Sequence, residues 1–128
     1  MNKKLLITGS VLGIIAITLG AFAAHGLEKL IDEKAIQSFE TGVRYQMYHA
    51  FFLLILGVTS FIKEKAKYDI LILVSIGVVF FSFSIYALAT NSLSTFDFKT
   101  IAFITPIGGL LLILAWVLLL INILKTKN

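Results

Sequence analysis

The stretch LLITGSVLGIIAITLGAFAA, residues 5–24, contains no charged side chain and decides the fold class. Twenty helical residues, at about 1.5 Å each, span about 30 Å, which is the thickness of the hydrocarbon core of a bilayer. We therefore expect a membrane-spanning helix here. The preceding Lys3-Lys4 and the sequence Ala21-Phe22-Ala23 also fit the basic region and the cleavage site of a signal peptide, which is the alternative interpretation of this stretch.

The composition points to the membrane as well. Of the 128 residues, 59% are hydrophobic and 14% are charged. Soluble domains average about 45–50% apolar and about 25% charged residues. The length predicts one domain, residues 1–128. The chain has no cysteine, which excludes disulfides, thiolate metal sites and cysteine nucleophiles.

Three further apolar segments predict spans at approximately 45–62, 70–90 and 103–124. The expected fold is therefore an all-α membrane protein with four transmembrane helices. Residues 27–44 differ, because apolar residues recur there at helical spacing with charged residues between them. This pattern predicts an amphipathic helix between spans 1 and 2, which either lies in the membrane interface or extends span 2.

The distribution of cations predicts the orientation. The N-terminus, the segment 63–69 and the C-terminal tail together contain seven lysines, whereas residues 25–44 and 91–100 contain four Lys or Arg. Short loops rich in Lys and Arg stay in the cytoplasm. We therefore expect a multi-pass plasma-membrane protein with both termini in the cytoplasm.

Small residues recur on one face of the first span. Gly9, Gly13, Ala16, Gly20 and Ala24 follow one another at spacings of three or four residues. Small side chains allow a neighbouring helix to approach closely in lipid. We interpret this face as a packing surface, with a second copy of the chain as a possible partner. The pair Gly108-Gly109 likewise indicates close helix packing.

The predicted topology gathers polar residues in the outer half of the spans. Polar groups in a membrane usually face other helices or a water-filled cavity. The cluster therefore predicts either a polar network between helices or an outward-facing pocket. The candidate residues are His25, Tyr45, Gln46, His49, Ser82, Tyr86 and Thr105.

Individual residues of this region suggest further roles. His25 and His49 could form a proton-sensitive pair, because imidazole as a side-chain type titrates near neutrality. Two histidines without a carboxylate at the same depth make a weak metal-ligand set. Thr105-Pro106 resembles an N-cap followed by a first-position proline, a helix start that can bind an anion. Trp116 is expected to fill the core.

No recognisable catalytic motif is present. The sequence lacks H-E-x-x-H, G-x-S-x-G and a phosphate-binding glycine loop, and its predicted spans contain no carboxylate. We therefore expect neither an enzyme nor a metal or cofactor site. A membrane explains the basic residues better than nucleic acid does, so the expected partner is the lipid bilayer.

Four motifs carry a family resemblance: GAFAAHGL (20–27), TGVRYQMYH (41–49), FSFSIY (81–86) and ITPIGG (104–109). In this order they resemble the bacterial inner-membrane family called domain of unknown function 423, also known as uncharacterised protein family 0382. The resemblance implies a four-span plasma-membrane protein and brings no established activity. The sequence departs from the family pattern at Ala23, Ala50, Phe83 and Ala115, where glycine is usual.

Two functions are compatible with these observations. The first is a non-enzymatic structural or accessory membrane protein, oligomeric through the small-residue face of span 1. The second is a small oligomeric transporter or channel subunit with an outward-facing polar pocket. A single bundle this apolar has little room for a pore, so transport would favour an oligomer.

Overall fold

The computed structural model describes residues 1–127, which are helical throughout apart from short turns and contain no strand. The expected all-α class is confirmed. The elements are α1 (Lys3–His25), η1 (Leu27–Lys29), α2 (Glu33–Val58), α3 (Glu64–Val78), η2 (Val79–Phe83), α4 (Ser84–Ala89), η3 (Asn91–Leu93), η4 (Phe98–Ile101) and α5 (Ile104–Lys125).

Three helical segments in the described chain are long and apolar enough to cross a membrane: Lys3–Lys29, Glu64–Ala89 and Phe98–Lys125. They correspond to the first, third and fourth expected spans. The helix α2 is long but is not among these three, and polar or charged residues occupy much of its sequence up to His49. A crossing by α2, and with it the number of four spans, remains a prediction.

The segment expected as an amphipathic helix between two spans is not a separate element. Residues 27–29 form a single 3-10 turn, and residues 33–44 are the first half of the continuous helix α2. The side chain of Asp32 starts this helix by accepting a hydrogen bond of 2.7 Å from the Ala35 amide. Residues 33–44 therefore continue directly into the helix that contains residues 45–58. The helix ends at Val58, four residues before the expected boundary.

The third long helical segment, which comprises α3, η2 and α4, is longer than expected and contains an irregularity. It begins at Glu64 rather than residue 70 and runs through α3, η2 and α4 to Ala89. The charged segment 63–69, which lies between the second and third expected spans, thus supplies the first turns of α3. The element η2 is a π-helical turn, a local widening that often occurs at functional sites.

The last helix matches the expected segment 103–124 within one residue at either end, but it starts without the expected cap. The helix α5 starts at Ile104, with Phe103 in the capping position and no side-chain cap. The assignment of Thr105 as the N-cap and Pro106 as the first helical residue was therefore wrong. Pro106 is tolerated as the third helical residue, because the first four amides of a helix need no intrahelical acceptor.

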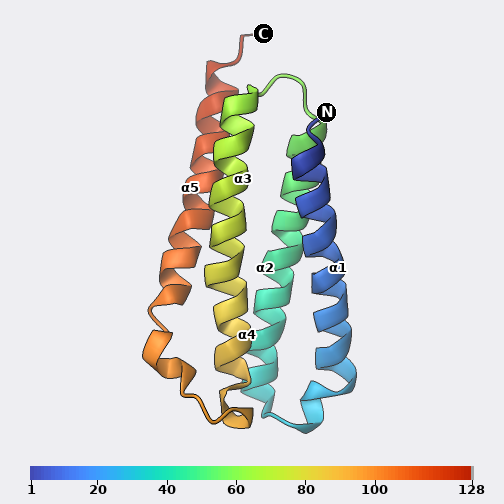
Figure 1. The fold of residues 1–128 in the computed structure, drawn as a ribbon, viewed down its shortest axis with the longest axis vertical. Coiled ribbons are helices and arrows are strands. Elements are labelled where there is room, and N and C mark those ends of the chain that lie inside the picture. The colour runs from blue at the N-terminus through green and yellow to red at the C-terminus, as the bar shows by residue number, and fades with distance from the viewer. Residues whose placement is uncertain (128) are drawn as a thin grey trace.

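The four long rods run side by side (Figure 1). The helix α1 packs mainly on α2, α3 packs mainly on α5, and α4 and η2 connect the two pairs by packing on α2. Both marked termini lie at the end of the molecule where α2 is joined to α3 (Figure 1). The connections 26–32 and 90–103 lie at the opposite end.

Candidate functional site

The small-residue face of α1 packs against α2 of the same chain. A Cβ atom added to Gly9 would lie 2.8 Å from the Ala50 carbonyl oxygen, and one added to Gly20 would lie 3.5 Å from a Val43 methyl group. A Cβ on Gly13 would lie 4.0 Å from the Ala50 Cβ. The packing surface that we expected on this face is therefore used by α2 of the same chain, and the homo-oligomer through the first span stays a prediction.

Gln46 connects three helices in the centre of the fold. Its side chain is fully buried, and its amide nitrogen donates a hydrogen bond of 2.8 Å to the Leu12 carbonyl oxygen of α1. Its amide oxygen accepts a bond of 2.7 Å from the Tyr86 hydroxyl of α4. Both functional ends of the side chain are thus used to join α2 to its neighbours.

The π turn η2 is held on both sides by close contacts with backbone. The buried Ser82 hydroxyl donates a 2.7 Å bond to the Gly42 carbonyl oxygen of α2. On the α5 side, a Cβ atom on Gly108 would lie only 2.3 Å from the Phe81 nitrogen. Gly109 is looser, since its nearest neighbour would be a Phe81 ring atom at 3.5 Å. The expectation of close packing thus applies to Gly108 more strongly than to Gly109.

A second hydroxyl contact lies where α4 meets α5. The Ser84 and Thr105 hydroxyl oxygens are 2.6 Å apart and share a hydrogen bond. The Ser84 hydroxyl also lies within hydrogen-bonding distance of the carbonyl oxygens of Phe80 and Phe81 in its own helix. Thr105 therefore joins two helices instead of capping its own.

His49 is fixed by hydrogen bonds at both ring nitrogens. The Trp116 indole N–H, which can only donate, points to His49 Nε2 at 3.1 Å, so Nε2 is the acceptor. The proton consequently resides on Nδ1, which donates to the Tyr45 carbonyl oxygen at 2.7 Å. Trp116 is 49% exposed instead of filling the core as expected, and its ring also stacks edge-on against Phe52.

His25 lies far from this histidine. It is the exposed last residue of α1. His49 lies between Gln46, which bonds Leu12, and Ala50, which faces Gly9, so it is level with residues 9–12 of α1. The two histidines are therefore separated by roughly 20 Å along the helix axis. Within residues 1–127, no group of three or more His, Asp or Glu side chains is arranged to hold a metal ion.

The candidate polar residues thus do not line one common cavity. A half-open pocket of about 340 Å³ lies beside Tyr45, His49, Gly109 and Trp116. His25, Gln46, Ser82, Tyr86 and Thr105 are not part of its lining. In the described chain, every buried side-chain nitrogen or oxygen has a hydrogen-bond partner. What the structure brings together is a set of interhelical hydrogen bonds.

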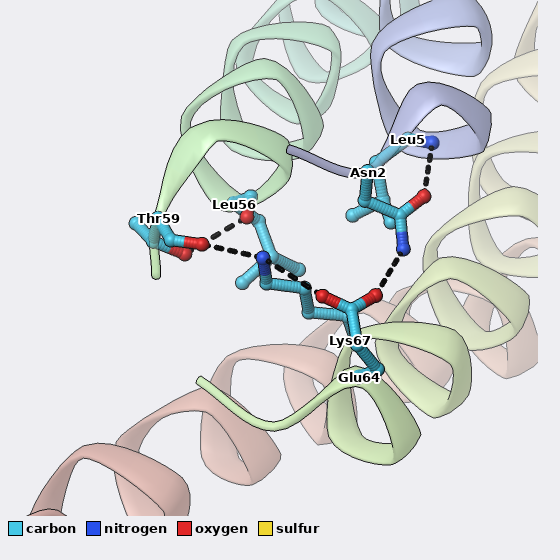
Figure 2. Close-up of polar contacts among 6 residues, drawn as sticks. All are labelled: Asn2, Leu5, Leu56, Thr59, Glu64 and Lys67. Atoms are coloured by element: carbon cyan, nitrogen blue, oxygen red, sulfur yellow. Dashed lines mark hydrogen bonds and ion pairs between the residues drawn. The ribbon is translucent and has the colours of Figure 1, made fainter. Parts of the chain in front are cut away.

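A polar cluster at the end near the termini was not foreseen from the sequence. Figure 2 shows the Lys67 ammonium reaching the Thr59 carbonyl oxygen, where α2 ends, and lying 3.5 Å from the Glu64 carboxylate. Asn2 donates a 2.8 Å bond to the same carboxylate and caps α1 through the Leu5 amide. The side chain of Lys67 is 1% exposed, although it belongs to a segment whose alternating charges indicate a solvated turn.

The four motif segments that carry the family resemblance supply most of these contacts, and a family model agrees. The model described as "Protein of unknown function (DUF423)" matches residues 19–109, which include Gly42, Gln46, His49, Ser82, Tyr86 and Gly108.

The chain belongs to the DUF423 family.

Full-length relatives support this assignment. A UPF0382 membrane protein of Staphylococcus haemolyticus is 39% identical over 96% of this chain and 97% of its own length. A UPF0382 membrane protein of Haemophilus influenzae is 34% identical over 100% of this chain and 99% of its own length. The UPF0382 inner membrane protein YgdD of Escherichia coli is 32% identical over 99% and 94%. No solved structure matches the chain. This DUF423 protein is therefore a membrane protein, as these relatives are.

Proposed function

We propose that this DUF423 protein is a four-span plasma-membrane protein with a non-enzymatic structural or accessory role, whose polar interior holds its helices together. The observation that carries the proposal is the complete pairing of the buried polar side chains in the described chain. Gln46, Ser82 and His49 each use their polar atoms on another helix or on their own backbone. Groups engaged in this way stabilise helix association and leave few free polar atoms to carry an ion.

The length of α2 and its neighbours support a crossing by this helix. Its 26 residues extend about 39 Å, longer than a hydrocarbon core. The helix packs along α1, a candidate span, from Gly20–Val43 at one end to Gly57–Leu6 at the other. The buried Gln46 and largely buried His49 face other helices, which is the position in which a membrane tolerates polar residues. We therefore propose that α2 crosses beside α1.

The orientation proposal combines charge with geometry. The lysines of the N-terminus, of residues 63–67 and of the C-terminal tail belong to the end at which both termini lie (Figure 1). Four crossings place both termini on one side, and the larger number of cations assigns that side to the cytoplasm.

The alternative is a small oligomeric transporter or channel subunit. The observation in its favour is the half-open pocket beside Tyr45 and His49, which offers an imidazole next to a space of about 340 Å³. The pairing of both His49 nitrogens weighs against proton exchange through this residue.

A proton-leak assay separates the two functions. We expect proteoliposomes with an imposed pH gradient and a pH-sensitive dye inside to lose the gradient as slowly as protein-free vesicles. The variant His49→Ala should behave in the same way, and so should His25→Ala, the control with an exposed histidine. A leak above that of empty vesicles that His49→Ala abolishes and His25→Ala preserves would establish the transport alternative.

A further inference from the structure

A row of hollows follows the junction between α2 and α5. The pocket beside His49 and Trp116 is followed by one of about 190 Å³ with a wholly apolar lining, which Trp116 also borders. A third hollow, of about 410 Å³, is lined by Lys63, Lys125 and Lys127. Trp116 is shared by the first two hollows and Phe61 by the second and third. The three hollows therefore follow one another from the middle of α2 to the end of α5, and we call the row the α2–α5 groove.

The two ends of this groove differ in chemistry. The middle is apolar, and Trp116 and Phe61 on its walls are 49% and 53% exposed. The end is basic, with three lysines and the Asn122 amide around it. The ion pairs within residues 1–127 join Lys65 to Asp69 and Lys67 to Glu64. No carboxylate of this part of the chain pairs with the three lysines of the groove.

We propose that the α2–α5 groove binds an anionic phospholipid. Its phosphate contacts Lys63, Lys125 and Lys127, and one acyl chain follows the apolar hollow past Trp116. Basic pockets between membrane helices bind anionic head groups, because the ammonium groups neutralise the phosphate at the edge of the hydrocarbon. Nine helical residues separate Trp116 from Lys125, about 14 Å along α5, so the indole meets the middle of the acyl chain.

Charge complementarity favours this occupant over a second copy of the chain. A second copy would bring its own three lysines to the same end of a symmetric contact, where like charges repel. The inference rests on the membrane embedding proposed above, but it does not depend on the absence of transport.

Trp116 is the only tryptophan, so its fluorescence reports on this groove alone. The experiment reconstitutes the full chain in phosphatidylcholine vesicles containing phosphatidylglycerol, with bromine on the middle of the acyl chains of one lipid or the other. Bromine quenches an indole that it touches. We expect brominated phosphatidylglycerol to quench more strongly than brominated phosphatidylcholine at equal mole fraction, with a preference of at least fivefold at the groove. A lysine near an anionic membrane surface contributes about fivefold in affinity, equivalent to about 1 kcal/mol.

The double variant Lys63→Gln/Lys125→Gln should lose most of this preference. The matched control is Lys3→Gln/Lys4→Gln, which removes the same charge at the same end but on α1, and it should retain the preference. Equal quenching by both lipids in the wild type, or an equal loss in both double variants, would overturn the proposal. Protection of Trp116 from both lipids together with crosslinking between copies would assign the groove to a dimer instead. An indole quenched by water-soluble iodide and by neither lipid would contradict the membrane embedding itself.

Discussion

Replacing Gly108 by alanine tests how closely α5 approaches the π turn. The added Cβ would lie 2.3 Å from the Phe81 nitrogen and 2.6 Å from the Phe80 carbonyl carbon, where ordinary contacts begin at 3.4 Å. Backbone atoms cannot rotate away, so α5 would have to move from η2 by about 1 Å, which costs the neighbouring side chains their contacts. We expect this overpacking to cost about 3 kcal/mol. Alanine recovers up to about 1 kcal/mol of helix propensity, so the net loss is about 2 kcal/mol.

Gly109→Ala is the matched control, since its Cβ would meet only ring atoms of Phe81 at 3.5 Å. It should leave stability unchanged or raise it by up to about 1 kcal/mol through helix propensity. The assay is unfolding of the purified protein in mixed micelles by increasing sodium dodecyl sulfate, followed by far-ultraviolet circular dichroism. The reasoning fails if Gly108→Ala unfolds at the wild-type midpoint, or if the two adjacent variants lose the same stability.

Three further predictions concern the contacts between helices. In a double-mutant cycle of Gln46→Leu and Tyr86→Phe, the same unfolding assay should give a coupling energy of about 0.6–1.7 kcal/mol, as for other hydrogen bonds within membranes. If the two substitutions change the stability independently, the 2.7 Å bond between these side chains contributes nothing. Lys67→Met should lower the free energy of unfolding by about 1–3 kcal/mol, because it leaves the carbonyl group at the end of α2 without its donor. The control Lys65→Met, at a side chain that is 82% exposed, should stay within about 0.5 kcal/mol of the wild type. Equal effects of the two substitutions would argue against the cluster of Figure 2. Gly9→Ala should lower the free energy of unfolding by about 1–2 kcal/mol, because the added Cβ lies 2.8 Å from the backbone of α2, and Gly13→Ala should change it little. Cross-linking should find the same oligomeric state in both variants. A change of oligomeric state in Gly9→Ala alone would show that this face contacts a second copy of the chain.

Hydropathy identified the helical class and the three helices that are long and apolar enough to cross a membrane, because length and apolarity are properties of each segment alone. The packing of Gly9 and Gly108 could also be expected from the sequence, since glycine is the residue that lets membrane helices approach. The helix against which each glycine packs could not be predicted from the sequence, because it depends on which helices become neighbours in the fold.

The remaining differences arise from tertiary contacts. Nothing in the apolar sequence of residues 79–83 predicts a π turn. Only the structure shows this turn, packed between Gly42 of α2 and Gly108 of α5. Lys67 resembles a solvated charge until the end of α2 provides a carbonyl acceptor. His25 and His49 were grouped because a second span starting at residue 45 would put both near the outer surface. The continuous helix α2 instead carries His49 past its own midpoint.

The crossing by α2 is tested most directly by the sidedness of the two termini. The chain has no native cysteine, so Lys3→Cys, Ser38→Cys and Thr126→Cys each give a single labelling site for a membrane-impermeant maleimide on intact cells. We expect Ser38→Cys to react from outside, and Lys3→Cys and Thr126→Cys to react only after permeabilisation. Four crossings require the two terminal sites to behave alike. Labelling of one terminal site but not the other on intact cells would show an odd number of crossings and would contradict the proposed passage of α2 through the membrane.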